Sequence, residues 1–488
     1  MFFNILVYFL RMVRRLAREI RNIKGIINII DYYDIKRRIS LVERVESAQT
    51  QLLRSNDRQL SGRVASVRGL VVDVTGLADA AAIGDRAVLV PNTGSPIAAE
   101  VIGFTEDRVE MMTYHPVDGL VGGMPVNLLS RRQSSLYPSR HWLGRVMDPL
   151  GIPIDDQGPM LQGPTPLVSR ASPPGAHARA RVGPQLELGV RVLDLFATCR
   201  QGQRMGLFAG SGVGKSTLMS MLTRGTKCDV AVLALVGERG REVREFIEDD
   251  LGSEGLGRSV VVVATSDAPP LMRRQCAYTA MTVAEYFRDQ GQSVLLLMDS
   301  VTRFCLALRE IGLSLAEPPA TRGYPPSVFA ELPRLLERAG PGIDGASGPT
   351  GHITGLFTVL VEGDDHNEPV ADAVRGILDG HIVMDRKIAE SGRYPAVDVL
   401  RSLSRLASSC LNEHQTALVR RARSILSLHS EMIDMVRLGA YRTGMDAAVD
   451  EALRLTPALE AVLRQEKGAR STYSEAFTLL EQALANAA

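Results

Sequence analysis

One short stretch, GSGVGKST at residues 210–217, constrains the fold more than any other part of this 488-residue chain. It follows the apolar run MGLFA and precedes LMSMLTR, whose apolar spacing is helical. A glycine-rich loop between a strand and a helix lets successive backbone N–H groups surround phosphate oxygens at the positive end of the helix. The residues expected to bind the phosphates of ATP are Gly210, Ser211, Gly212, Val213, Gly214, Lys215, Ser216 and Thr217. The sequence therefore predicts a nucleotide-binding P-loop domain.

Two residues of this loop have specific chemistry. Lys215 places a cation on the outer phosphates, and the Ser216 hydroxyl is placed to bind Mg²⁺. Ala209 stands where the strict motif begins with glycine, a position that a small side chain occupies without strain if its φ is negative. A glycine-rich loop formed by chance is the alternative, and the strand–loop–helix context argues against it.

A carboxylate, Asp299, ends the apolar run SVLLLMD. Because the carboxyl ends of parallel strands face the ligand crevice, this side chain is expected to hold Mg²⁺ through water. The alternative, a cap for the helix that starts at SVTRF, is compatible with that role.

Glu238 and Arg239 open GERGREVREF, directly after the apolar run VAVLALV. Hydrolysis of a triphosphate needs a group that orients the attacking water in line with the γ-phosphate. A carboxylate at the end of a strand is well placed for that task. A helix cap or a surface charge is the alternative, and the nearby phosphate loop and Asp299 favour the catalytic interpretation.

The pattern along the chain predicts a multidomain protein. Short alternating segments punctuated by Gly, Pro, Asn and Asp indicate a small β-barrel, and continuous apolar runs between helical stretches indicate a mostly parallel sheet in a RecA-like α/β domain. The last part of the chain has helical periodicity. The expected division is an N-terminal extension of basic amphipathic helices at 1–57, the β-barrel at 58–132, a linker at 133–180, the P-loop ATPase core at 181–405 and a helical C-terminal domain at 406–488.

Composition narrows the class of protein. The 56 Lys and Arg side chains against 55 Asp and Glu argue against a protein that coats nucleic acid. The five cysteines are scattered and lack any CxxC pair, which indicates a reducing, cytoplasmic compartment. Residues 1–40 begin with an apolar run too short to span a bilayer, followed by basic residues. That segment either contacts an anionic membrane surface, or is a solvated or partner-bound helix, or lies upstream of the true start codon.

Elementary chemistry alone does not assign a role to two further residues, Tyr394 and Arg405. Tyr394, in RYPAVDVLRSLSR, has an aromatic face that can stack on adenine, but a half-buried core tyrosine is the alternative. An arginine supplied in trans stabilises the charge that develops on the γ-phosphate. Nothing in the spacing of this segment selects Arg405 over its neighbours for that role.

A resemblance to a known family assigns roles to both residues. AGSGVGKST, VGERGREVREF, MDSVTRF, EPPATRGYPPSVFAELPRLLERAG, VLVEGDDHNEPVADAVRGILDGHIV and RYPAVDVLRSLSR together resemble the ATPases of type III protein export, cousins of the rotary ATP synthase subunits. The likeness runs from about residue 58 to the end. The chain looks most like a flagellar export ATPase, with the injectisome ATPase as the alternative.

The resemblance implies roles residue by residue. Glu238 matches the residue that activates water, Arg239 lies beside it at the γ-phosphate, and Asp299 matches the metal-associated aspartate. Tyr394 matches the adenine-stacking tyrosine, and Arg405 matches the arginine finger that reaches into the neighbouring subunit's site. One chain with both halves of a site implies a homohexamer with composite interfaces.

The resemblance also implies partners: a stator-like negative regulator at the N-terminal segment, a central stalk subunit, an export gate, chaperones and export substrates. The expected location is cytoplasmic, at the inner face of the inner membrane, with peripheral contact possible. The Pro-rich loop at 317–329 faces the central channel in related hexamers. One departure is Leu308, where many relatives have Gln.

Three other functions fit the sequence less well. A rotary synthase subunit would carry GGAGVGKT rather than AGSGVGKS and lack EGDDHNEP. A ring-shaped nucleic-acid translocase would need aromatic stacking platforms, whereas residues 58–130 contain only Phe104 and Tyr114 as aromatics. A non-catalytic nucleotide-binding subunit is disfavoured by the presence of Glu238.

Overall fold

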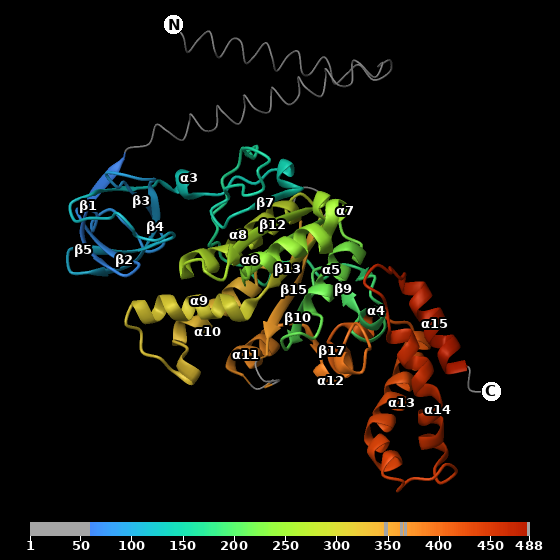
Figure 1. Ribbon diagram of the computed structural model, residues 1–488. Coiled ribbons are helices and arrows are strands. Elements are labelled where there is room, and N and C mark those ends of the chain that lie inside the picture. The colour runs from blue at the N-terminus through green and yellow to red at the C-terminus, as the bar shows by residue number, and fades with distance from the viewer. Residues whose placement is uncertain (1–58, 346–349, 362–364, 366–367, 486–488) are drawn as a thin grey trace, which may run out of the picture.

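The computed structural model describes residues 59–345, 350–361, 365 and 368–485. It arranges them as a β-barrel, a central sheet covered by helices and a helical C-terminal unit (Figure 1). This confirms the predicted fold class. The expectations for residues 1–57 and for most of EGDDHNEP fall on residues outside this description.

The N-terminal unit is a closed six-stranded barrel with strand order β1-β2-β5-β4-β3-β6. Every neighbouring pair is antiparallel, and alternate side chains, such as Val72 and Val74, point into the barrel core. The strands are β1 (Leu60–Arg68), β2 (Val71–Thr75), β3 (Arg86–Leu89), β4 (Ile97–Thr105), β5 (Arg108–Thr113) and β6 (Pro125–Leu128).

The central sheet has the order β17-β16-β10-β15-β13-β11-β12-β7, and short β14 pairs with β15. All pairs along this order are parallel except β16 with β17. The strands are β7 (Arg145–Met147), β10 (Arg204–Ala209), β11 (Val230–Glu238), β12 (Ser259–Thr265), β13 (Ser293–Asp299), β14 (Gly340–Pro341), β15 (His352–Leu360), β16 (Gly380–Met384) and β17 (Val397–Ser404); β8 (Gln185–Leu186) and β9 (Cys199–Arg200) form a separate pair.

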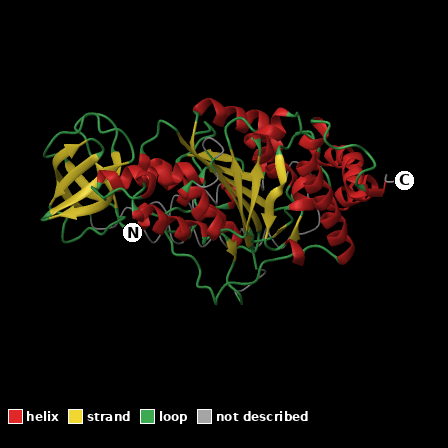
Figure 2. Ribbon diagram, turned by 90° about the horizontal axis from the view of Figure 1, so that it is seen from below, coloured by secondary structure: helices red, strands yellow, loops and turns green. Residues whose placement is uncertain are grey.

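Helices cover both faces of this sheet (Figure 2). In β11 the side chains of Ala231, Leu233 and Leu235 enter one core and those of Val232 and Ala234 the other, which is why the strand is continuously apolar. The helices of this unit are α4 (Arg191–Phe196), α5 (Lys215–Gly225), α6 (Gly240–Glu245), a π-helix (Phe246–Leu251), α7 (Gly252–Gly257), α8 (Pro270–Arg288), α9 (Val301–Ser314), α10 (Pro326–Leu336), α11 (Pro369–Ile377) and α12 (Arg386–Glu390).

The segment expected to be a linker, 133–180, contributes to the sheet. Its three-residue strand β7 pairs in parallel with β12 and forms the sheet edge opposite β17. The sequence pattern missed this strand because three residues are too few for a hydrophobic period. The short helix α3 (Arg131–Ser134), capped by Ser130, overlaps the start of this segment.

A buried ion pair joins the barrel to the core. Glu100 of β4 accepts hydrogen bonds from Arg274 of α8 at 2.6 and 2.7 Å and from the Tyr114 hydroxyl at 2.6 Å. Glu100 and Arg274 are almost fully buried, so removal of either partner would leave an uncompensated charge. The pair fixes how the barrel is attached to the ATPase core.

The C-terminal unit consists of α13 (Glu413–Arg437), α14 (Ala447–Leu463) and α15 (Tyr473–Ala485). Asn412 and Asp446 cap the first two helices through their side chains. Apolar residues of all three helices belong to the same core as those of α4 and α5. Within the described ranges, no helix combines the length and apolar character needed to cross a membrane.

Candidate functional site

The P-loop lies between the end of β10 and the start of α5, as the sequence predicts. Gly212 and Gly214 have φ values of 78° and 87°, a region that side chains with a Cβ rarely adopt. A Cβ added at Gly214 would lie 3.3 Å from the Tyr394 ring. The glycines therefore permit both the loop's curvature and its close approach to Tyr394.

Lys215 lies between two carboxylates at the carboxyl edge of the sheet. Its Nζ is 2.5 Å from Asp299 Oδ1 and 3.5 Å from Glu238 Oε1. Both carboxylates are less than a tenth exposed. They end β13 and β11, which are adjacent parallel strands, so the topology brings them together.

Asp299 is fixed by a second hydrogen bond, because the Thr358 hydroxyl donates to its Oδ1 at 2.6 Å. The cap of α9 is the Ser300 hydroxyl, which accepts from the Arg303 backbone N–H at 3.3 Å. Asp299 is therefore available for the nucleotide site and does not serve as the helix cap.

A β-bulge at the end of β11 sets the position of Glu238. The register between β11 and β12 shifts between Val236 and Glu238, and the intervening Gly237 has φ 72°. A Cβ at Gly237 would lie 2.8 Å from the Arg303 side chain, whose Nη2 is 3.6 Å from Glu238 Oε2. Glycine at this position lets Arg303 cover the strand end and reach the carboxylate.

The pKa of Glu238 is raised above the ordinary glutamate value. Burial is the main cause, and the neighbouring Asp299 carboxylate adds to it, while Lys215 and Arg303 oppose the shift. A carboxyl whose pKa moves toward neutrality is better suited to exchange a proton with water.

Tyr394 lines a cavity of about 560 Å³ beside the P-loop. Its side chain is 44% exposed, and the cavity is also lined by Gly212, Gly214 and Thr217 of the loop and its helix. The far wall is residues 464–467, which follow α14. An exposed aromatic face next to a phosphate loop suits the stacking of a nucleotide base.

Gln465 joins that far wall to the core. Its backbone N–H donates to the Tyr394 carbonyl at 2.9 Å, and its side-chain Nε2 donates to the Gly189 carbonyl at 2.9 Å. Its Oε1 accepts from the Arg191 backbone N–H at 2.9 Å. The C-terminal unit thus contributes to the base cavity through a buried amide.

Two predicted site residues lie away from this cluster. Arg239 projects to solvent, with its side chain 77% exposed and paired with Glu242 at 3.1 Å. Arg405 follows β17, which is antiparallel to its neighbour and so ends at the edge of the sheet opposite the P-loop. The six residues of β10 separate these edges by about 20 Å. Arg405 therefore cannot contact the phosphate loop of its own chain.

The donor atoms present fit Mg²⁺. Ser216 at the start of α5 and Asp299 offer hard oxygen ligands, and Mg²⁺ binds through one or two such groups together with phosphates and water. In the described part of the chain, no three His, Cys, Asp or Glu side chains gather into an all-protein metal site. Lys215 occupies the position between the carboxylates that a cation would favour.

Three residues of the site were missed by sequence reasoning: Thr358, Arg303 and Gln465. Thr358 lies within a continuously apolar strand, where a lone hydroxyl facing the ligand edge was the available signal. Arg303 lies in the first turn of α9, directly after the strand that ends in Asp299, and a basic residue at that position was the available signal. Gln465 had no such signal, because the partners that join it to the core, Gly189, Arg191 and Tyr394, are more than 70 residues away along the chain.

Leu308, the position where many relatives have Gln, is half-buried against the core on one face of the sheet. The Pro-rich loop at 317–329 contains a short 3-10 turn, Thr321–Gly323, and the start of α10. Arg322 of this turn pairs with Asp365 at 2.9 Å.

Family models match three parts of the chain. Residues 64–129 match the β-barrel domain of the ATP synthase alpha/beta family, and residues 189–404 match the nucleotide-binding domain of that family. Residues 411–482 match the T3SS EscN ATPase C-terminal domain.

Relatives match along most of their length. The chain is 53% identical to a flagellum-specific ATP synthase of Caulobacter vibrioides, over 87% of this chain and 95% of that protein. It is 44% identical to a type 3 secretion system ATPase of Xanthomonas euvesicatoria, over 89% and 98%. Among solved structures, the assembled ATPase EscN of enteropathogenic E. coli is 37% identical, with a TM-score of 0.79 over 87% of this chain and all of that one.

The barrel, the nucleotide-binding core and the helical C-terminal unit thus match families of export and synthase ATPases, and the relatives match along most of this chain. The chain belongs to the family of flagellum-specific ATP synthases and type III secretion ATPases, and it is an ATP-hydrolysing enzyme.

Proposed function

We propose that this chain hydrolyses MgATP in a ring of identical subunits and that hydrolysis drives protein export through a flagellar apparatus. The observation that carries the proposal is Lys215, held between the buried carboxylates of Glu238 and Asp299 at the end of the P-loop. The flagellar assignment is supported by the identity of 53% to the Caulobacter protein, against 44% to the Xanthomonas secretion ATPase.

Each site residue has a defined task in this proposal. The backbone N–H groups of residues 210–217 and the Lys215 ammonium bind the phosphates. Glu238 accepts a hydrogen bond from the attacking water and orients it in line with the γ-phosphate. Tyr394 stacks on the adenine base. Mg²⁺, held by Ser216 and through water by Asp299, supplies electrostatic stabilisation of the phosphate charge when it is bound.

The position of Arg405 supports the proposed ring. Its backbone leaves the sheet at the edge opposite the loop, and we assign its guanidinium to the site of a neighbouring copy. There it stabilises the charge that develops on the transferred phosphoryl oxygens. Arg239 is placed near the γ-phosphate by the resemblance alone, and that role requires it to leave Glu242.

The proposed partners follow the family. A solved structure of EscN is in complex with its central stalk EscO, and we assign a similar stalk to this chain, with the loop at 317–329 facing it. We assign a stator-like negative regulator to the N-terminal segment, and an export gate, chaperones and export substrates to the ring. The expected location is the cytoplasmic face of the inner membrane. No nucleic-acid partner is proposed.

The injectisome is the second candidate, supported by the secretion-system relatives. Deletion of the gene in its source organism separates the two. Loss of flagellar filaments and motility, restored by the wild-type chain and not by Glu238→Gln, is the expected result. Intact filaments with loss of effector secretion would favour the injectisome.

The enzymatic part is tested with purified protein. Specific ATPase activity is measured against protein concentration, while light scattering after size-exclusion chromatography reports the mass of the assembly. We expect activity per subunit to rise with ring formation. Equal activity per subunit in monomer and ring would contradict the proposal.

A further inference from the structure

The backbone that carries Arg405 is tied to the start of β10. The Arg405 backbone N–H donates to the Asp379 carbonyl at 3.0 Å. The preceding residue, Ser404, accepts a hydrogen bond from the buried Gln203 side chain at 3.0 Å and donates to the Thr198 carbonyl at 2.7 Å. Arg405 therefore leaves the sheet from a backbone position that several hydrogen bonds define.

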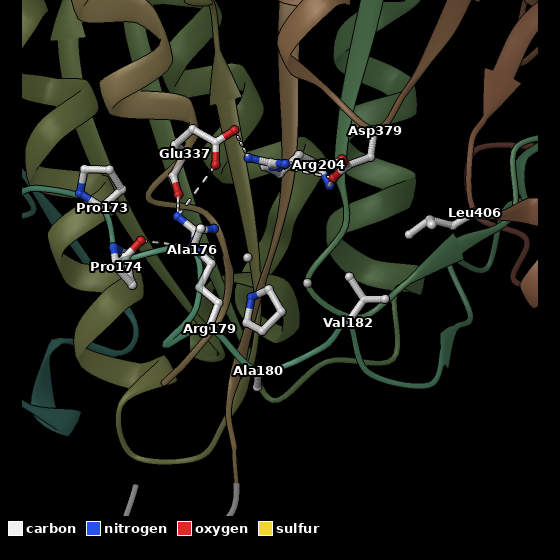
Figure 3. A pocket seen from close by; sticks show the side chains of 13 residues that line it. Pro173, Pro174, Ala176, Arg179, Ala180, Val182, Arg204, Glu337, Asp379 and Leu406 are labelled. Atoms are coloured by element: carbon white, nitrogen blue, oxygen red, sulfur yellow. Dashed lines mark hydrogen bonds and ion pairs between the residues drawn. The ribbon is translucent and has the colours of Figure 1, made fainter. Parts of the chain in front are cut away.

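Asp379 is itself held by Arg204. The Asp379 carboxylate accepts from the Arg204 backbone N–H at 3.0 Å and from its guanidinium Nε and Nη2 at 3.1 and 3.2 Å. The Asp379 backbone N–H donates to the Arg204 carbonyl at 2.9 Å. The other edge of the guanidinium contacts Glu337 at 2.5 Å, as Figure 3 shows.

The ion pair between Arg204 and Asp379 lies in a partly buried place. Arg204 and Asp379 line a cavity of about 370 Å³, together with Arg179 and Leu406, the residue after Arg405 (Figure 3). The side chains of Arg204 and Asp379 are 16% and 27% exposed. A two-point contact between an arginine and a carboxylate in such a half-buried place fixes geometry better than an exposed pair.

The side chain of Arg405 lacks such support. It is exposed, and its guanidinium makes no hydrogen bond or ion pair with the described residues. The precision with which it reaches another subunit therefore depends on its backbone. Misplacement of a catalytic group by about 1 Å can cost about 100-fold in rate.

We propose that Asp379, clamped by Arg204, is the positioning residue for Arg405. It touches neither nucleotide nor the reacting atoms of any site, and it acts by fixing the backbone from which Arg405 extends toward a second copy of this chain. The inference rests on the proposed function, because it presupposes that Arg405 acts in trans. The same strand, β10, then carries the anchor at one end and the P-loop at the other.

The test is Asp379→Asn, which keeps the shape of the side chain but removes its charge and one acceptor oxygen. We expect kcat to fall by about tenfold, with the KM for ATP changed less than about twofold. Arg204→Lys keeps the charge but loses the two-point contact, and we expect an intermediate loss of kcat.

Asp155→Asn is the matched control. Asp155 accepts two guanidinium hydrogen bonds from Arg145 at 2.7 and 2.8 Å and one from the Val146 backbone N–H, at the sheet edge opposite β17. The variant Asp155→Asn disturbs a comparable arginine–carboxylate ion pair that does not contact Arg405. We expect kcat within about twofold of wild type. A loss equal to that of Asp379→Asn would show a general structural effect and overturn the inference.

A double-mutant cycle separates positioning from structure. The assay is release of radiolabelled phosphate. In an Arg405→Ala background, Asp379→Asn should cause no further loss of kcat. An equal fold-loss in both backgrounds would overturn this inference and leave the proposed function intact. A wild-type rate for Arg405→Ala alone would contradict the proposed function and this inference with it.

Discussion

The two ends of the central sheet differ in how their functional residues are fixed. At the carboxyl edge, Lys215, Glu238 and Asp299 contact one another within one chain, and each ends a strand or starts a helix. At the opposite edge, Arg405 extends from a strand end, and only its backbone has partners in the described chain.

This difference shows why one end carries a recognisable motif and the other does not. The phosphate loop must fold around its ligand within a few consecutive residues, so its glycines and lysine are constrained locally. In the proposed function Arg405 is presented to another molecule, and the hydrogen bonds that hold its backbone come from Asp379, Arg204 and Gln203, which are distant in sequence. Under that proposal, a single chain holds two incomplete halves of a site.

The largest expected effect on kcat comes from removing the Arg405 side chain at the edge opposite the P-loop. Arg405→Ala should lower kcat by about 1,000-fold or more, because a guanidinium at the transferred phosphoryl group is worth that much in related chemistry. Nucleotide binding by each chain should persist, since the loop is untouched. The measurement is steady-state phosphate release, with equilibrium binding of a fluorescent ATP analogue.

The control for this variant is Arg401→Ala. Arg401 belongs to the same strand and is exposed, but it pairs with Asp385 at 3.4 Å. It should change kcat by less than about threefold, because isolated exposed pairs contribute little. Equal losses from both variants would mean that the strand, and not one guanidinium, was disturbed.

The second prediction concerns Glu238, at the carboxyl edge of the sheet beside the P-loop. Glu238→Gln should lower kcat by about 100-fold to 10,000-fold, the usual contribution of a positioned proton acceptor, while ATP still binds. Glu245→Gln changes an exposed carboxylate of α6 that pairs with Arg241 at 3.3 Å, and it should leave kcat unchanged. Retained hydrolysis in Glu238→Gln would move the catalytic role to another residue.

The third prediction tests the base cavity, which draws on the C-terminal unit. Tyr394→Ala should weaken ATP binding by about 10-fold to 100-fold, because stacking of a base on an aromatic ring contributes about 1–3 kcal/mol. Tyr394→Phe retains the ring and should bind ATP as wild type does. Isothermal titration calorimetry of both variants gives the dissociation constants, and unchanged binding in Tyr394→Ala would remove the stacking role.

The smallest effect is on stability without nucleotide. The raised pKa of Glu238 means that the folded chain holds this proton more tightly than the unfolded chain, so ionisation costs stability as pH rises above about 4.3. Glu238→Gln removes that cost and should raise Tm by about 1–2 °C at pH 7.5. The gain should shrink as pH falls below about 4.3, where the Glu238 carboxyl is protonated in both the folded and the unfolded chain.

Differential scanning calorimetry measures this gain, with Glu245→Gln as the exposed control. A lower Tm for Glu238→Gln at pH 7.5 would mean that the contacts to Lys215 and Arg303 outweigh burial and the repulsion from Asp299. In that case, the catalytic edge would be stabilised by its charges in the free enzyme.

The sequence predicted the parts of this molecule that have a local pattern. The three-unit architecture and the parallel sheet followed from apolar runs and turn residues, and the P-loop followed from consecutive residues 210–217. The partnership of Lys215 with Asp299 could be anticipated because parallel strands end at one edge. The assigned roles of individual residues remain predictions for the experiments above.

What the sequence could not predict depends on contacts that are remote in the chain. The three-residue strand β7 was read as linker, and the amide of Gln465 meets Gly189 across 276 residues. The anchoring of Arg405 by Asp379 links residues 26 apart through a backbone hydrogen bond, which leaves no trace in composition or periodicity.

The account's central claim is that the active site is completed by a second copy, and mixing two inactive variants tests it most directly. Glu238→Gln subunits supply an intact Arg405, and Arg405→Ala subunits supply an intact phosphate edge. In randomly mixed rings about a quarter of the interfaces are complete, so activity should rise to about a quarter of the wild-type value per subunit. Activity no higher than the average of the two separate variants would contradict the shared site.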